Sequence, residues 1–358
     1  MAHQFDQNLA RLALEICRFT YAAGIGNAAN APDRSDALAY LKAHSNPLAD
    51  PIPILGGGTS FACVVPYADR NVVSYMGTKT EFGFNKLAEL DDLLKSGQVL
   101  TMLPEAKSII EQFRDSLRDW GQNGKARPVA FELEGRHIGQ AKGVTLEGRV
   151  HHGFLSELKA VQEGIVATLN RQGGVARPVL VTGHSQGGAE AALATRALAA
   201  AGFNVEVTYT FAAPRTGSAE FVNSVKTPVH RIEFGDDIVP HLPPTLIKTA
   251  LEEIVAHHPV LLVALKAALH TVEDFGYVGL GPLCYGHPNE QQFHADLSAT
   301  AEKALFEKRL KLLPKSPKHW GEHHHLAGTT AEVAAGERGN YTVLVSPNGW
   351  PVALNTTV

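Results

Sequence analysis

The chain has little of several features that would assign it to a specialised class of protein. Its three cysteines, Cys17, Cys63 and Cys284, are odd in number and far apart, which favours buried free thiols over a disulfide framework. Its best apolar run, residues 259–265, is far too short to cross a membrane. The net charge is only −4 and no long basic or acidic block occurs, so no nucleic-acid partner is expected.

The N-terminus also lacks a basic segment followed by an apolar one, which is the pattern of a secretory signal. The chain as written is therefore expected to be cytoplasmic. A processed chain would look the same, so secretion stays an alternative. The sequence carries no signal for the oligomeric state.

Strands and helices alternate along the second half of the chain. Apolar strands at residues 179–182, 205–211 and 229–234 are separated by helices, and an amphipathic helix at residues 156–170 precedes them. This alternation predicts an α/β fold with a mostly parallel central sheet flanked by helices. The content of 44% hydrophobic and 19% charged residues is typical of a globular protein. Because α/β folds of this length are often one domain with insertions, one domain over residues 1–358 is expected.

Two helical insertions interrupt this domain. The first, at about residues 79–125, is expected to be either a mobile lid or an ordinary packed insertion. The second, at about residues 245–271, is an apolar helical pair that could line an acyl pocket as a cap or dock on the core. Elsewhere the pattern predicts strands at residues 60–66, 71–76 and 277–285 and mostly loop at residues 30–58.

The sequence Gly-His-Ser-Gln-Gly at residues 183–187 joins a predicted strand to a predicted helix. This is the pattern of a nucleophile elbow, a tight turn that holds a serine side chain in the open. Gly183 and Gly187 are expected because a Cβ at either position would collide with the opposite arm of the turn. Ser185 is therefore the candidate nucleophile, and the N–H of Gln186 the first candidate oxyanion donor.

A serine nucleophile needs an imidazole base, and the imidazole needs a carboxylate that orients it. In this type of fold both partners follow the serine in the chain. Asp236 and Asp237 lie just past the predicted strand at residues 229–234, at the sheet edge where parallel strands collect catalytic groups. One of the two is expected to be the acid and the other a turn residue.

Five short motifs occur in order along nearly half of the chain. They are Met-Gly-Thr at 76–78, Val-His-His-Gly-Phe-Leu at 150–155, Gly-His-Ser-Gln-Gly at 183–187, Phe-Ala-Ala-Pro-Arg-Thr-Gly at 211–217 and Asp-Ile-Val-Pro-His-Leu-Pro at 237–243. In this order the chain resembles the class 3 lipases, the group that includes the filamentous-fungal triacylglycerol lipases. The resemblance implies an α/β-hydrolase fold and places the acid directly before Ile-Val-Pro, at Asp237.

The histidine base is less defined by sequence. The resemblance implies a loop with the pattern His-x-(Leu/Ile/Met)-x-x-Tyr, which His324 fits with Thr329 in place of the aromatic residue. His323 and His325 are the neighbouring alternatives. The other histidines after the acid are His241, which follows it too closely, and His257, His258, His270, His287, His294 and His319, of which His287 and His294 stay open.

The resemblance implies a second oxyanion donor at Thr78. Two residues before it, this chain has Met76 where most members of the family have arginine. Residues 56–58, three consecutive glycines, resemble the oxyanion loop of other esterases but lack the preceding histidine, so a turn is expected there. The histidines at residues 323–325 could suggest a metal site. Adjacent loop histidines rarely converge on one ion, however, so neither metal nor cofactor is expected.

These expectations together describe a serine carboxylic ester hydrolase. A lipase is predicted, acting through an acyl-enzyme on acylglycerol or other fatty-acyl esters at a lipid–water interface. A phospholipase A1 and a medium-chain carboxylesterase are alternatives with the same chemistry. From a different class, the fold could serve as a catalytically silent binding module.

Overall fold

The computed structural model describes residues 4–25, 38–39, 41–43, 45–57, 60–77, 108, 127–237, 239–242, 263, 266, 275–287, 291–312, 324, 341 and 352–354. Both predicted insertions therefore lie outside the described residues, apart from Ser108 in the first and Val263 and Lys266 in the second. The lid and cap stay predictions.

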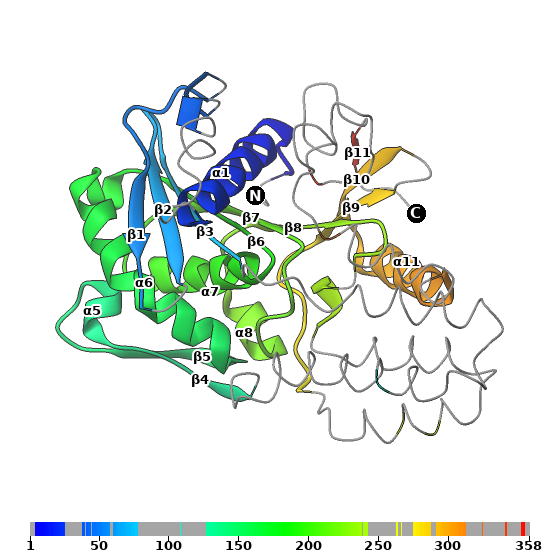
Figure 1. Ribbon diagram of the computed structural model, residues 1–358. Coiled ribbons are helices and arrows are strands. Elements are labelled where there is room, and N and C mark those ends of the chain that lie inside the picture. Colours follow the sequence, from blue (N-terminus) through cyan, green and yellow to red (C-terminus); the bar gives the residue numbers. More distant parts are fainter. Residues whose placement is uncertain are drawn as a thin grey trace.

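A nine-stranded sheet forms the centre of the molecule (Figure 1). Its strands are β1 (Ile52–Leu55), β2 (Phe61–Pro66), β3 (Asn71–Tyr75), β6 (Val179–His184), β7 (Val205–Phe211), β8 (Val229–Phe234), β9 (Leu283–His287), β10 (Gln292–Leu297) and β11 (Val352–Leu354), in this spatial order. The five strands from β3 to β9 are parallel, while β1, β2 and β10 pair antiparallel at the two ends. The predicted mostly parallel sheet is confirmed.

The strands differ from the sequence predictions in two places. Strand β1 lies within the segment expected to be loop, because its four residues pair with β2 although proline and glycine surround them. The strand expected at residues 277–285 begins only at Leu283. Before it, Val278 makes a single bridge to Gly217, and Gly281 adopts a positive φ of 83° that breaks the ladder.

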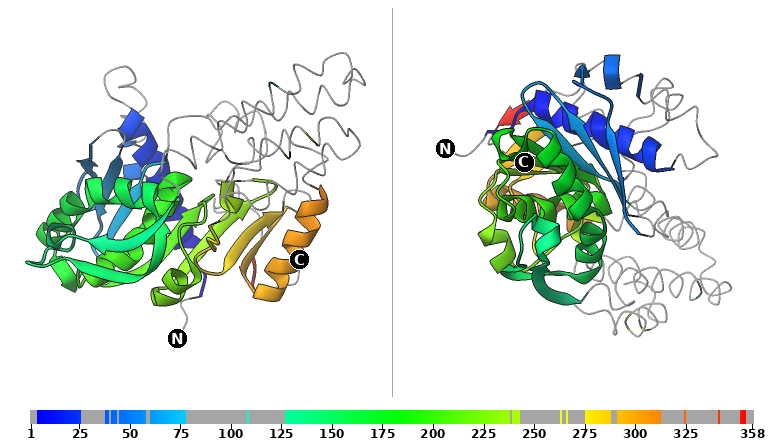
Figure 2. Two further views of the ribbon diagram at one scale, coloured as in Figure 1. Left: turned by 90° about the horizontal axis from the view of Figure 1, so that it is seen from below. Right: turned by 90° about the vertical axis from the view of Figure 1, so that its left-hand side faces the viewer.

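Helices cover both faces of the sheet (Figure 2). They are α1 (Gln7–Ile25), α5 (Gly135–Ile138), α6 (His152–Arg171), α7 (Gln186–Ala200), α8 (Ala219–Ser224) and α11 (Ala299–Leu312), with short 3-10 turns η1 (Gly174–Ala176) and η2 (Val239–His241). Helix α1 packs on β2, β3 and β6 from one side, and α6 and α7 pack on the same part of the sheet from the other.

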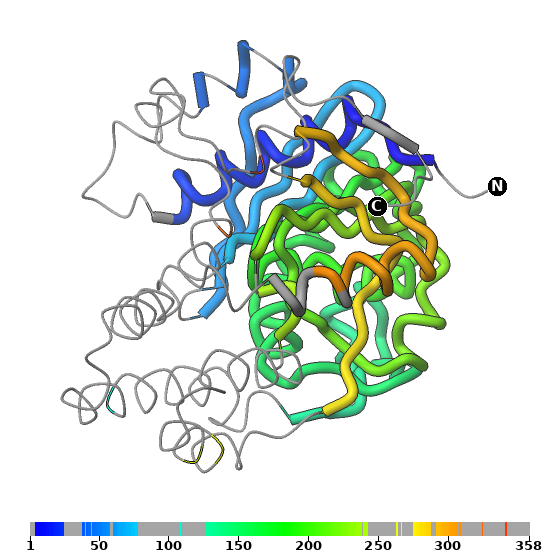
Figure 3. The backbone as a smooth tube through the Cα atoms, turned by 90° about the vertical axis from the view of Figure 1, so that its right-hand side faces the viewer, coloured from blue at the N-terminus to red at the C-terminus, as the bar shows by residue number. Residues whose placement is uncertain are grey.

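The alternation of side chains along each strand produces two apolar cores. In β2, Ala62 and Val64 point into the core under α6 and α7, whereas Cys63 and Val65 point into the core under α1. All four are fully buried, as expected for strands with helices on both faces. Helix α11 packs beside β9 and β10 near the end of the sheet (Figure 3).

A separate hairpin of β4 (Pro128–Leu133) and β5 (Val144–His151) leads into α6. The imidazole of His151 begins α6, because its Nδ1 accepts the N–H of Phe154 over 3.3 Å. With β3, β6, β7, β8 and β9 parallel, their carboxyl ends meet at one edge of the sheet, where the elbow and the loop after β8 lie.

Candidate active site

The elbow connects β6 to α7 through Ser185. This serine has φ 56° and ψ −130°, a strained backbone conformation for a residue with a side chain. Its N–H is held by the carbonyl of Phe211 at the end of β7, over 2.9 Å. The side chain is 8% exposed. The strain is therefore maintained by the packed sheet and helix on either side of the turn.

The glycines of the elbow allow three backbone segments to approach one another. A Cβ on Gly183 would lie 2.1 Å from the carbonyl oxygen of Gly187, in the opposite arm, as expected from the sequence. A Cβ on Gly187 would instead meet the carbonyl oxygen of Tyr75 at 2.2 Å, in the neighbouring strand β3. The second glycine is thus required by the contact between α7 and β3, not by the turn alone.

His324 lies between Ser185 and Asp237. Its Nε2 is 2.9 Å from Ser185 Oγ, and its Nδ1 is 3.1 Å from each carboxylate oxygen of Asp237. Because a carboxylate only accepts, Nδ1 carries the hydrogen and Nε2 accepts the serine O–H. The three groups are thus in the order and polarity of a serine, a base and an orienting acid.

The turn after β8 positions Asp237. Its N–H donates to the carbonyl of Phe234, the last residue of β8, over 3.1 Å. Its Oδ1 accepts the N–H of Val239, the first residue of η2, over 2.9 Å. Asp237 is completely buried, whereas Asp236 is half-buried. Of the two candidate aspartates, it is Asp237 whose carboxylate reaches His324.

A second histidine contacts the backbone of the first. His184 Nε2 lies 2.8 Å from the backbone carbonyl oxygen of His324, so Nε2 carries a hydrogen. In the neutral ring Nδ1 then accepts the hydroxyl of Tyr21, 3.0 Å away on α1. The rings of His184 and His324 lie 4.9 Å apart. The first helix and the elbow together therefore fix the position of the base.

Of the two oxyanion candidates, Gln186 lies within the described residues and Thr78 does not. Gln186 is the first residue of α7, where backbone N–H groups have no partner within the helix. Thr78 lies outside the described residues, but its neighbour Gly77 lies against the elbow, because a Cβ there would be 3.1 Å from Ser185 Cβ. Gly56 belongs to the turn between β1 and β2, with its N–H on the carbonyl of Ser60.

The other candidate bases lie apart from Ser185. His241 ends η2, 3.5 Å from a carboxylate oxygen of Glu233, and lines a separate cavity of about 250 Å³. His287 ends β9, and His294 is a buried residue of β10. Outside the described residues lie His257, His258, His270, His319, His323 and His325.

A buried carboxyl group lies one helical turn beyond the elbow. Glu190 is 1% exposed, and its Oε1 accepts the side-chain N–H of Gln186 over 3.1 Å. Burial raises the pKa of Glu190 well above its ordinary value, which favours the protonated form. The residue after the nucleophile is thus tied to α7 by its side chain.

Among the described residues, one group of three metal-binding side chains occurs, and it lies elsewhere. His230, Cys284 and Asp296 have ligand atoms within 4.8 Å of one another. They already bond to each other, since Asp296 Oδ1 accepts from His230 Nδ1 at 2.7 Å and from Cys284 Sγ at 3.6 Å. The other oxygen of Asp296 accepts the N–H of Phe5, so the group anchors the N-terminal segment.

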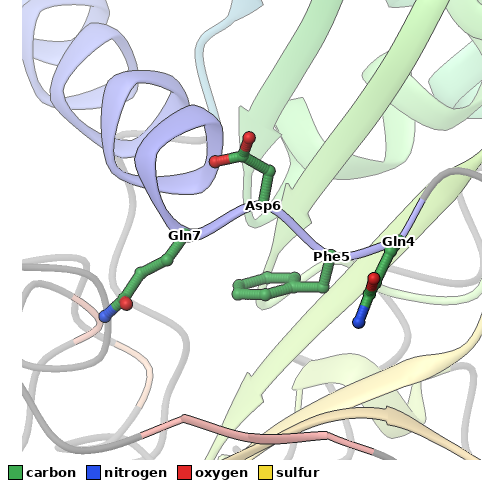
Figure 4. Close-up of a pocket in the computed structure, with 4 residues that line it drawn as sticks. All are labelled: Gln4, Phe5, Asp6 and Gln7. Atoms are coloured by element: carbon green, nitrogen blue, oxygen red, sulfur yellow. The ribbon is translucent and has the colours of Figure 1, made fainter.

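That segment also lines an open hollow of about 470 Å³, formed by Gln4, Phe5, Asp6 and Gln7 (Figure 4). The Asp6 carboxylate turns toward the first turn of α1, where it accepts the N–H groups of Asn8 and Leu9. The side chains at this hollow therefore begin a helix and pack the end of the sheet.

Three residues of this site were absent from the sequence predictions. His184 contacts the His324 carbonyl, Tyr21 contacts His184, and the hydroxyl of Tyr341 donates to Asp237 Oδ2 over 2.6 Å. His184 is part of the elbow sequence, so its place beside Ser185 was available as a signal. Tyr21 and Tyr341 come from opposite ends of the chain, and no local pattern connects them with the elbow.

Comparison with known proteins matched residues 105–247 to the sequence model of the family described as class 3 lipase. The protein named secreted mono- and diacylglycerol lipase 1, from Fusarium solani, is 40% identical over 101 residues. The match covers 26% of this chain and 30% of the length of that relative.

Solved structures of fungal lipases align over much of the chain at low identity. The Rhizomucor miehei triacylglyceride lipase is 20% identical over 79% of this chain and 81% of its own, with a TM-score of 0.47. The lipase of Rhizopus microsporus var. chinensis is 18% identical over 80% and 78%, with a TM-score of 0.44. The fold of this chain is established from its own sheet order and elbow. No helix in the described part of the chain has the length and apolar character needed to cross a bilayer.

Proposed function

We propose that the chain is a member of the class 3 lipase family and a lipase that hydrolyses acylglycerol and other fatty-acyl esters at a lipid–water interface. The observation that carries this proposal is the position of the His324 ring, with one nitrogen 2.9 Å from Ser185 Oγ and the other 3.1 Å from the Asp237 carboxylate. The name of the Fusarium solani relative supports acylglycerols as the substrate class.

In the proposed reaction, Ser185 Oγ attacks the ester carbonyl while His324 Nε2 takes the serine proton. Asp237 keeps the Nδ1 hydrogen in place and stabilises the imidazolium that forms. The negative oxygen of the tetrahedral intermediate is held by the N–H of Gln186 and by Thr78, the two proposed oxyanion donors.

The intermediate collapses when His324 returns the proton to the leaving alcohol oxygen, which breaks the ester bond and leaves the acyl group on Ser185. Water then attacks this acyl-enzyme, with His324 again taking a proton, and the fatty acid leaves as Ser185 is restored. The described site residues supply all the proton transfers of this cycle.

The Fusarium solani relative is named as a secreted protein. This supports the extracellular alternative over the cytoplasmic one, and we propose that the chain acts outside the cell. Buried free thiols are compatible with that setting, because all three cysteines are shielded from solvent.

The test is a series of p-nitrophenyl esters of increasing chain length, followed by mono-, di- and triacylglycerol emulsions. Ser185→Ala, His324→Ala and Asp237→Asn should each lower kcat by about 10⁴-fold or more. His294→Gln is the matched control, because it changes a buried histidine of β10, which β9 separates from β8.

Labelling with a fluorophosphonate separates enzyme from binding module. The wild-type protein is expected to take the label, and Ser185→Ala is expected to remain unlabelled. A folded wild-type chain that neither hydrolyses esters nor takes the label would refute the proposal. If His324→Ala kept its activity while His294→Gln lost it, the assignment of the base would be wrong.

A further inference from the structure

We infer that Tyr341 is a positioning residue for the proposed reaction, holding the Asp237 carboxylate in the orientation that directs His324 at Ser185. This inference rests on the proposed function. It starts from one contact, in which the Tyr341 hydroxyl donates to Asp237 Oδ2 over 2.6 Å. A distance this short is typical of a hydroxyl donating to an ionised carboxylate.

The carboxylate of Asp237 has protein donors on both oxygens. Oδ1 accepts the N–H of Val239, Oδ2 accepts the hydroxyl of Tyr341, and His324 Nδ1 lies 3.1 Å from both. Asp237 and Tyr341 are both completely buried. Since a buried anion requires donors in place of water, each of these contacts helps to keep the charge where the imidazolium forms.

The ring of Tyr341 is held by packing, so the hydroxyl has a fixed position. Ring centroids of Phe211 and Phe234, at the ends of β7 and β8, lie 6.2 and 6.1 Å away. The ring of His184 lies 5.9 Å away on a third side, nearly perpendicular. Tyr341 therefore contacts the elbow through His184, the ends of β7 and β8 through Phe211 and Phe234, and the acid through Asp237.

Because Val239 donates to one oxygen of Asp237 and Tyr341 donates to the other, the carboxylate plane cannot rotate away from His324. Loss of the hydroxyl would free one oxygen and let the plane turn, which lowers the fraction of molecules in which His324 Nε2 faces Ser185 Oγ. It would also leave more negative charge on the carboxylate. The protonated His324 ring, which cannot accept the serine proton, would then persist to a higher pH in the variant.

Among the described residues, the titratable side chains of Asp237 and His184 contact His324, and Tyr341 contacts both of these. His184 bonds to the His324 carbonyl and to the Tyr21 hydroxyl, whereas the Tyr341 hydroxyl donates to the Asp237 carboxylate. The charge of Asp237 is therefore the part of the site that the Tyr341 hydroxyl modulates.

The test is Tyr341→Phe, which removes only the hydroxyl. Its matched control is Tyr209→Phe, another completely buried tyrosine whose hydroxyl donates to the backbone carbonyl of Asp6. Both variants are assayed with p-nitrophenyl butyrate from pH 5 to 9, with fluorophosphonate titration of active sites and a urea unfolding curve.

In Tyr341→Phe, kcat is expected to fall about 10- to 100-fold at unchanged KM. The acid limb of its pH–rate profile should also move to higher pH, while Tyr209→Phe keeps the wild-type profile. An unchanged kcat and profile, or an equal loss in both variants with no shift of the acid limb, would overturn the inference. Failure of the wild type to hydrolyse or be labelled would instead refute the proposed function.

Discussion

Gly183→Ala tests the geometry of the elbow directly. The added Cβ would lie 2.1 Å from the carbonyl oxygen of Gly187, 2.3 Å from its carbon and 2.8 Å from the nitrogen of Gly188. Ordinary contacts of a Cβ begin at about 3.4 Å, so the two arms of the turn must separate by more than an ångström. All three atoms belong to the backbone, and no flexible side chain can yield.

Adding a small group to a packed core lowers the free energy of unfolding by about 1–3 kcal/mol. Because the added Cβ of Gly183→Ala meets backbone atoms, we expect a loss near the upper end, about 3 kcal/mol. With a typical denaturant dependence this lowers the urea midpoint by about 1 M or more. The same displacement moves Ser185 relative to His324. A shift of about 1 Å of a reacting group can lower the rate about 100-fold.

The control is Gly57→Ala, because a Cβ at Gly57 would meet nothing within 4 Å. Its free energy of unfolding should stay within about 0.5 kcal/mol of wild type, with full esterase activity. Urea unfolding followed by tryptophan fluorescence, together with p-nitrophenyl butyrate hydrolysis, measures both effects. If Gly183→Ala matched Gly57→Ala in midpoint and in kcat, the tight approach of β6 and α7 would be refuted.

Two further predictions concern buried titratable groups. Burial raises the pKa of Glu190 above its ordinary value of 4.5, so its contribution to stability is complete below about pH 4.5 and is lost as the pH rises. The unfolding free energy of Glu190→Gln should therefore rise relative to that of wild type as the pH increases from 4.5 to 7, by at most about 1.4 kcal/mol per pH unit. A difference between the two proteins that stays constant with pH would contradict this. Burial likewise raises the pKa of the Cys17 thiol to about 12, and Cys63 and Cys284 are as deeply buried. None of the three should react with Ellman's reagent in the folded protein, and all three should react in urea; fast reaction without denaturant would show that the core opens.

Much of the fold could be predicted because periodicity and local motifs are properties of neighbouring residues. Apolar strands that alternate with helices predicted the parallel part of the sheet, and strands β7 and β8 have the bounds expected from the sequence. Strand β1 was missed, since its four residues become a strand only by pairing with β2. The segment before Leu283 was overpredicted, because its apolar residues contact other elements without forming a ladder.

The sequence by itself determined the nucleophile candidate, since the elbow is a local pattern of glycines around Ser185, and the order of motifs narrowed the acid to Asp237. Only the tertiary structure decided how the remaining groups meet. The base, His324, lies 139 residues after the nucleophile, and the supporting residues Tyr21, His184 and Tyr341 come from three separate segments. No spacing rule connects such residues, because they become neighbours only when the parallel strands bring their carboxyl ends to one edge of the sheet.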